Sequence, residues 1–218
     1  MLPNWVTLPF DQYRARRIAD HLLRFVTPGE SILDCGCGSM LVAQRLKETS
    51  GVRIVGTDVI NLNRTDLSMC LCPAESLAFA SACFDIVILV SVLHHVNDQV
   101  EALHECLRVA SHRVLILEDV YENAVELLLL KVLDWIGNRQ VSSAINLPFR
   151  FKSESEWTSL FNALGVRSSA TQSVIIIPWR PSRHRLFVLE KPQSEITKAD
   201  FVVLTDRIPF KVNIEVLN

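Results

Sequence analysis

The sequence has no long apolar run and no block of like charge. Its most apolar helix candidate, residues 124–136, carries Glu126, Lys131 and Asp134 and falls far short of the ~20 apolar residues of a membrane span, so we expect no stable membrane insertion. The net charge is −2, and the basic residues form no stripe that would indicate a nucleic-acid partner. Residues 1–10 lack the basic and apolar regions of a secretory signal, so we expect a cytoplasmic protein.

The cysteine spacing of a zinc site is also missing. Paired zinc ligands are usually separated by about two to four residues, whereas a single residue separates Cys35 from Cys37 and Cys70 from Cys72. We therefore expect the six cysteines to be reduced thiols, and we predict no metal-ligating residue in the chain.

The length of 218 residues, 49% of them apolar, suits one globular domain and is too short for two ordinary ones. We expect residues 1–192 to form this domain, with a cap segment at residues 121–157. Residues 193–218 differ in pattern, because apolar stretches flank Asp206 and Arg207. This pattern predicts a C-terminal extension that forms a β-hairpin and provides either an added sheet edge or a homodimer contact.

Apolar runs alternate with helical patterns along the chain, which indicates a mostly parallel α/β sheet. Residues 178–184 are too few for a parallel crossover between the last two strands, so the last strand should be antiparallel. The prediction is a doubly wound seven-stranded sheet. Its strands are expected at residues 31–34, 52–57, 68–72, 84–90, 112–118, 174–177 and 185–189. Helices are expected at residues 11–26, 39–48, 124–136 and 153–164. Ser39 is the expected N-cap of the second helix, and a further helix should follow the capping pair Asp98 and Glu101.

A glycine turn follows the first of these strands. Asp34 ends the strand, and Gly36 and Gly38 lie in the turn before the next helix, where the backbone can approach a ligand closely. Asp58 comes 24 residues after Asp34, at the end of the second strand. A carboxylate at this place can accept hydrogen bonds from both hydroxyl groups of a ribose. This arrangement predicts a site for a nucleotide-like ligand.

The turn and four later segments resemble the class I S-adenosylmethionine-dependent methyltransferases, of the small-molecule, type 11-like group. These segments are Ala74-Glu-Ser-Leu-Ala-Phe79, Phe84-Asp85-x-Val87, Val92-Leu-His-His95 and Leu107-Arg-Val109, and the resemblance covers residues 22–190. Residues 134–138, 147–149 and 156–157 are similar to a subgroup that methylates small molecules. The resemblance implies a Rossmann-like fold, S-adenosylmethionine as cofactor and a small-molecule acceptor.

The resemblance also implies roles for particular residues. The methionine end of the cofactor should lie against Asp34 and the backbone of Gly36, Cys37 and Gly38, with backbone near Leu89 beside the amino acid moiety. The ribose should lie at Asp58, and the adenine should contact Val59 and face the amide of Ala74. Two positions depart from the family pattern, because Met40 replaces a third glycine and Pro73 replaces an acid that would bind the adenine amino group.

Methyl transfer by in-line displacement needs a base when the acceptor is a hydroxyl, a thiol or a protonated amine. Our candidates are His95, because histidine titrates near neutral pH, and Asp119, because a carboxylate can orient an imidazole. We expect a small, hydrophobic acceptor to enter over residues 91–95 and 119–125, under residues 138–157.

Two other functions remain open from the sequence. A nicotinamide-dependent oxidoreductase also uses a glycine turn and a distal acid, although the short antiparallel ending disfavours it. A catalytically degenerate, methyltransferase-like binding or scaffolding protein is the second alternative, because Met40 and Pro73 depart from the family pattern.

Overall fold

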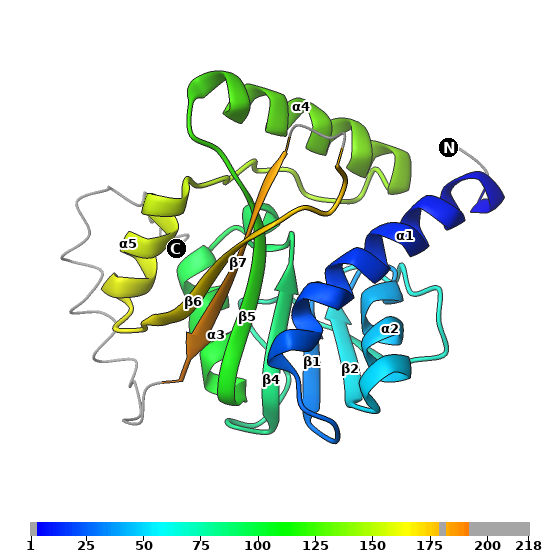
Figure 1. The fold of residues 1–218 in the computed structure, drawn as a ribbon, viewed down its shortest axis with the longest axis vertical. Helices are drawn as coiled ribbons and strands as arrows, with labels where there is room; N and C mark the ends of the chain where they lie inside the picture. Colours follow the sequence, from blue (N-terminus) through cyan, green and yellow to red (C-terminus); the bar gives the residue numbers. More distant parts are fainter. Residues whose placement is uncertain (1–3, 179–181, 192–218) are drawn as a thin grey trace, which may run out of the picture.

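The computed structural model describes residues 4–178 and 182–191, and the side chains from residue 8 onward. A seven-stranded sheet with the order β3-β2-β1-β4-β5-β7-β6 forms its centre (Figure 1). Six strands run in the same direction, and the last strand, β7, is reversed as predicted, because it pairs antiparallel with both β5 and β6. The strands are β1 (Ser31–Cys35), β2 (Arg53–Asp58), β3 (Met69–Leu71), β4 (Phe84–Val90), β5 (Ala110–Val120), β6 (Ser168–Val174) and β7 (Arg183–Glu190).

Helices cover both faces of the sheet because the central strands are apolar on both sides. On one face α1 (Asn4–Leu22), its extension η1 (Leu23–Phe25) and α2 (Leu41–Ser50) pack over a core that includes Ile32. On the other face α3 (Gln99–Val109) and α5 (Glu154–Ala163) pack over a core that includes Leu33. Neighbouring residues of β1 thus enter opposite cores, as the alternation of side chains along a strand requires.

The C-terminal prediction, a hairpin and homodimer contact in residues 193–218, lies outside the described residues. Several predicted boundaries within the described part are wrong. The first helix begins at Asn4 rather than at residue 11, and α4 ends at Val141 rather than at residue 136. The apolar run 174–177 misplaced β6, because Ile176 and Ile177 are buried in a core without belonging to a strand. The N-cap of α2 is Met40 rather than Ser39, and its side chain makes no capping hydrogen bond.

Met40 adopts a left-handed conformation (φ +58°) that favours glycine, which explains why the family pattern has glycine at this position. Its fully buried side chain fills the space that Gly56 of β2 leaves open. A β-carbon at Gly56 would lie 2.7 Å from Met40 Cε and 2.7 Å from Cys37 Sγ. The departure at Met40 is therefore accommodated inside the core, beneath the glycine turn.

The helix α4 (Ala124–Val141) lies across the end of the sheet at which the parallel strands finish, away from the two covered faces (Figure 1). The apolar sequence of this helix suggests a core element, yet Leu130 is its only buried residue. Large apolar side chains of α4 are exposed, namely Val125, Leu128, Val132, Trp135, Ile136 and Val141. Among the described residues, no helix is both long and apolar enough to cross a membrane.

Candidate functional site

The glycine turn joins β1 to α2 and is fastened to β2 by its own amides. The N–H groups of Gly36 and Cys37 donate to the carbonyl oxygen of Thr57 at 2.7 and 2.9 Å, and the N–H of Gly38 donates to Asp58 Oδ2 at 2.9 Å. These three amides are therefore already used within the protein. The turn can therefore contact a ligand through the exposed side of its backbone rather than through these three amides.

The two glycines of the turn are required for different reasons. A β-carbon at Gly36 would lie 2.4 Å from Val92 Cγ2, so the backbone could not pack against the segment after β4. Gly38 adopts a left-handed conformation (φ +49°), and a β-carbon there would meet no atom within 4 Å. The backbone of Gly38 therefore borders open space, where a ligand can approach it closely.

Asp34 and Asp58 lie beside each other at the ends of β1 and β2. The side chain of Asp34 is 3% exposed and receives no hydrogen bond from the described residues. Burial, and then the negative charge of Asp58, raise the pKa of Asp34 to about 7. Asp58 faces the glycine turn through Oδ2, which accepts the N–H of Gly38, and its Oδ1 accepts the N–H of Ile60 at 3.2 Å. Within the part of the chain that the structure describes, no positively charged or hydroxyl-bearing side chain pairs with either carboxyl group.

The other predicted cofactor residues surround this pair in different states of burial. Val59 follows β2 and is 64% exposed, so its side chain can cover a flat ring. Ala74 and the side chain of Cys37 are buried, and burial raises the pKa of the Cys37 thiol. Leu89 pairs with β1 and β5 inside the sheet, so the strand leaves the sheet only beyond it.

Pro73 opens a turn in which its carbonyl oxygen accepts the N–H of Ser76 at 3.1 Å. The next acid, Glu75, directs its Oε1 toward the N–H groups of Asn97 and Asp98, at 3.0 and 3.4 Å. Glu75 thus holds the segment before α3, and this carboxylate oxygen is used inside the protein.

The far side of the site begins at the short helix η2 (Leu93–His95), which follows β4. His94 is 1% exposed, and its Nδ1 lies 2.6 Å from Glu118 Oε2 of β5. Glu118 Oε1 accepts the N–H groups of Val92 and Leu93, at 2.8 and 2.7 Å. Burial lowers the pKa of His94, but Glu118 and Asp134 raise it more strongly, to about 10.

Among the described residues, no ion pair joins His95 to Asp119, the two predicted catalytic residues. His95 Nε2 lies 3.5 Å from Asp134 Oδ1 of α4, and its Nδ1 lies 3.1 Å from the carbonyl oxygen of Asn146. Asp119 Oδ1 instead lies 3.2 Å from His184 Nε2 of β7. Burial, and then the neighbouring His94, lower the pKa of His95. His95 is thus oriented by Asp134, and Asp119 by a different histidine.

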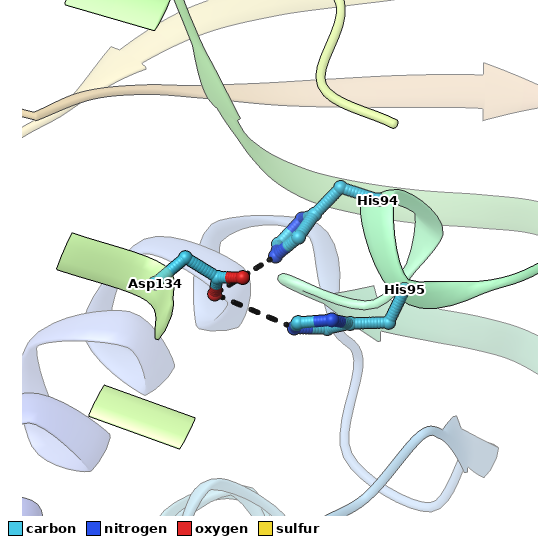
Figure 2. Close-up of side chains that lie close together, drawn as sticks. All are labelled: His94, His95 and Asp134. Carbon is cyan, nitrogen blue, oxygen red and sulfur yellow. Dashed lines mark ion pairs between the residues drawn. The ribbon is translucent and has the colours of Figure 1, made fainter. Parts of the chain in front are cut away.

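Sequence reasoning missed Asp134 as a site residue. In the sequence, this acid only interrupts an apolar helix and belongs to a segment similar to small-molecule methyltransferases. The fold supplies the missing information, because α4 crosses the edge of the sheet and brings Asp134 to two histidines about 40 positions earlier in the chain (Figure 2).

A surface hollow of about 610 Å³ opens beside this edge of the sheet. Its lining comes from the segment after β5, from the N-terminal part of α5 and from Arg185 of β7. It overlaps the predicted entry for an acceptor at Val120, Tyr121 and Glu122 and does not include Asp34 or Asp58.

Residues 33–117 match the protein family described as a methyltransferase domain. A curated relative is the ubiquinone/menaquinone biosynthesis C-methyltransferase UbiE of Ralstonia nicotianae, which is 27% identical over 150 residues. This match covers 60% of the chain and 61% of the relative, so the chain spans less than two thirds of the relative's length.

Solved structures resemble the chain over most of its length. A Haloferax volcanii methyltransferase in complex with the activator Trm112 has a TM-score of 0.66 at 19% identity, over 83% of this chain and 91% of that one. Magnesium protoporphyrin IX methyltransferase from Synechocystis, with bound SAH, has a TM-score of 0.59 at 16% identity, over 84% and 83%. The [4+2]-cyclase SpnF has a TM-score of 0.62 at 15% identity, over 82% and 81%. Such likeness establishes the fold, on which activities differ.

The buried carboxyl of Asp34 should make the stability of the protein depend on pH. Its pKa lies near 3.8 in an unfolded chain and near 7 in the folded one. The folded state therefore holds the proton more tightly, and Asp34 opposes folding increasingly as the pH rises from about 4 to about 7. Asp34→Asn should raise the free energy of unfolding by about 2–4 kcal/mol at pH 8 and by much less at pH 4.5, measured by urea denaturation.

Asp66→Asn is the control for this comparison, because Asp66 is exposed in the loop after β2. It should change stability little at either pH. A change for Asp34→Asn that is equal at the two pH values, or a loss of stability at pH 8, would contradict the assigned role of burial.

Proposed function

We propose that the chain is a class I S-adenosylmethionine-dependent methyltransferase that transfers a methyl group from this cofactor to a small, hydrophobic acceptor. The buried Asp34 beside the half-buried Asp58 is the observation that carries the proposal. S-Adenosylmethionine brings the chemical groups that this pair lacks, because it has an α-ammonium group and two ribose hydroxyl groups. A cation beside Asp34 stabilises the ionised carboxylate, and hydroxyl groups can donate to the remaining lone pairs of Asp58.

The surroundings of the pair fit the rest of the cofactor. The open space at Gly38 leaves room for the methionine end to pass close to the turn formed by Gly36, Cys37 and Gly38. The exposed Val59 provides an apolar surface for the adenine, with the backbone of Ala74 at its edge. The segment that leaves the sheet after Leu89 would lie beside the amino acid moiety. We retain these predicted contacts as parts of the proposal.

The bound cofactor would supply a methyl group on a positively charged sulfur. A nucleophilic atom of the acceptor would attack the methyl carbon in line with the carbon–sulfur bond, and the sulfur would leave as part of S-adenosylhomocysteine. The protein's main contribution is to hold the two reactants in that alignment, which can lower the barrier by ~7–11 kcal/mol in favourable cases. His95 and Asp119 are the candidates for removing an acceptor proton or stabilising the anion that remains. Asp134 positions His95, and His184 accompanies Asp119.

Two observations support a hydrophobic acceptor. The helix α4, which crosses the proposed acceptor side, exposes several large apolar side chains, with Trp135 52% exposed. The curated relative is named for C-methylation in the biosynthesis of ubiquinone and menaquinone, which are apolar molecules. We therefore propose that the acceptor binds beneath α4 with its apolar part against this helix.

Binding of S-adenosylhomocysteine, the demethylated product, tests the cofactor proposal. Gly38→Ala adds a methyl group to the proposed ligand space, and Gly51→Ala adds one at the other end of α2. Both glycines have left-handed backbones, and both would place the methyl in open space, so each substitution should cost about 1 kcal/mol of stability. Calorimetry should show binding to the wild type and Gly51→Ala, and at least about tenfold weaker binding to Gly38→Ala, a loss of about 1.4 kcal/mol.

Absence of binding to the wild-type protein at ~1 mM S-adenosylhomocysteine, which corresponds to less than about 4 kcal/mol of binding free energy, would contradict the proposal. Equal affinity of the Gly38→Ala and Gly51→Ala variants would place the ligand elsewhere. Melting temperatures measured without ligand separate either result from loss of the fold.

The acceptor side can be tested once a screen of small hydroxylated ring compounds yields turnover. His95→Ala should then lower kcat by about a hundredfold, because groups that handle a proton contribute on this scale. The affinity for S-adenosylhomocysteine should stay the same. His112→Gln is the control, because His112 is an exposed histidine at the opposite end of the sheet. Unchanged turnover in His95→Ala would remove this residue from the mechanism.

A further inference from the structure

Three side chains from two elements converge at the acceptor side: His94 and His95 of η2 and Asp134 of α4 (Figure 2). Asp134 Oδ1 lies 3.5 Å from Nε2 of each histidine. These separations are longer than ordinary N–H···O hydrogen bonds, which span about 2.7–3.2 Å. They match two ligands of one tetrahedral zinc ion, since atoms that each lie ~2.1 Å from the ion are roughly 3.4 Å apart.

The outer nitrogens of both histidines are already occupied. His94 Nδ1 faces Glu118 Oε2 at 2.6 Å, and His95 Nδ1 faces the carbonyl oxygen of Asn146 at 3.1 Å. Without an ion, the raised pKa keeps His94 protonated at neutral pH, so a metal ion must displace the Nε2 proton of His94. With Nδ1 of each ring still carrying its proton, each Nε2 then offers an unshared electron pair. Metal-bound histidines characteristically donate their second N–H to a carboxylate or a backbone carbonyl, so both partners have the arrangement that a metal site requires.

Asp134 gives independent support for a missing ligand. Its Oδ1 accepts a hydrogen bond from Asn138 Nδ2 at 2.7 Å, which fixes the carboxylate toward the histidines. Its Oδ2 is buried and has no hydrogen-bond partner among the described residues. A buried carboxylate oxygen without a partner is costly, because it has lost its contact with water.

The charge of the cluster indicates the kind of ligand that is missing. Asp134 and Glu118 together contribute two negative charges beside the two imidazoles, and Glu118 is fully buried. Protonated His94 offsets one of these charges, and a divalent cation that displaces its proton would balance both. Imidazole nitrogen is a ligand for zinc and other transition metals, whereas magnesium and calcium prefer oxygen. We propose that His94, His95 and Asp134 bind one divalent transition-metal ion, with zinc as the best match to this geometry.

Three protein ligands leave the fourth position of a tetrahedral zinc ion open, as in catalytic zinc sites. This inference rests on the proposed methyl transfer: the open position of the ion would bind an oxygen atom of the acceptor. The acceptor class is thereby narrowed to molecules with a hydroxyl or carbonyl oxygen close to the atom that receives the methyl group. His95 then acts as a ligand, and the ion stabilises negative charge on the acceptor oxygen.

Calorimetric titration of Zn²⁺ into the full-length, chelator-treated protein tests the site, and Co²⁺ provides a spectroscopic probe. The wild type should bind one ion, and bound Co²⁺ should give the visible absorption of a four-coordinate site with nitrogen and oxygen ligands. His95→Gln and Asp134→Asn remove ligands and should weaken binding at least about a hundredfold. Glu118→Gln keeps an oxygen that can accept the N–H groups of Val92 and Leu93 but removes the carboxylate partner of His94, and it should weaken binding about 10- to 100-fold. His112→Gln should leave binding unchanged.

Absence of stoichiometric binding to the wild type would overturn the proposal. Binding that His95→Gln and Asp134→Asn leave intact would also overturn it, as would a thiolate–cobalt absorption band, which would identify cysteine ligands instead. Circular dichroism of each variant confirms its fold. Titration of the same samples with S-adenosylhomocysteine separates the two proposals: cofactor binding without metal binding rejects the metal site alone, and the reverse result rejects the proposed function alone.

Discussion

The buried carboxylate of Asp34 beside Asp58 is the interaction on which the rest of this account depends. Two acids at the ends of adjacent strands repel each other, and Asp34 has no hydrogen-bond donor among the described residues. Such an arrangement destabilises the ligand-free protein, and it becomes favourable when a ligand brings positive charge and hydroxyl groups. The glycine turn, the position of α2 and the exposed Val59 all lie around this pair.

The backbone around the pair has little freedom to rearrange. The turn is fastened to β2 through the carbonyl oxygen of Thr57 and the carboxylate of Asp58, and Gly36 packs against Val92 after β4. Met40 replaces a glycine of the family pattern without closing the ligand space, because its side chain enters the core over Gly56. The departure at this position is therefore compatible with a working site, and it does not by itself favour a degenerate protein.

Much of the fold could be predicted from the sequence, because periodic apolar patterns and short connections have direct physical consequences. The buried strand β4, the antiparallel β7 and the capping residue Asp98 of α3 all follow from such local signals. The strand β6 did not, because its polar, alternating sequence at the edge of the sheet is less apolar than the buried segment after it.

The candidate site likewise contains residues that the sequence predicts and partners that it does not. Asp34 and Asp58 follow from a local motif with known spacing, whereas the partners of His95 and Asp119 come from α4 and β7, far along the chain. No spacing rule connects residues at such separations. For the same reason, the absence of zinc-like cysteine spacing indicated no metal site, although the fold assembles His94, His95 and Asp134 into a cluster with suitable ligand geometry.

The most direct test of the central claim is the number of protons released when S-adenosylhomocysteine binds, measured by calorimetry at pH 7 in buffers of different ionisation enthalpy. Asp34 should be about half protonated in the unliganded protein and should ionise beside the ammonium group. The account predicts release of about half a proton per ligand from the wild type and almost none from Asp34→Asn. Binding without proton release by the wild type, or equal release by both proteins, would contradict it.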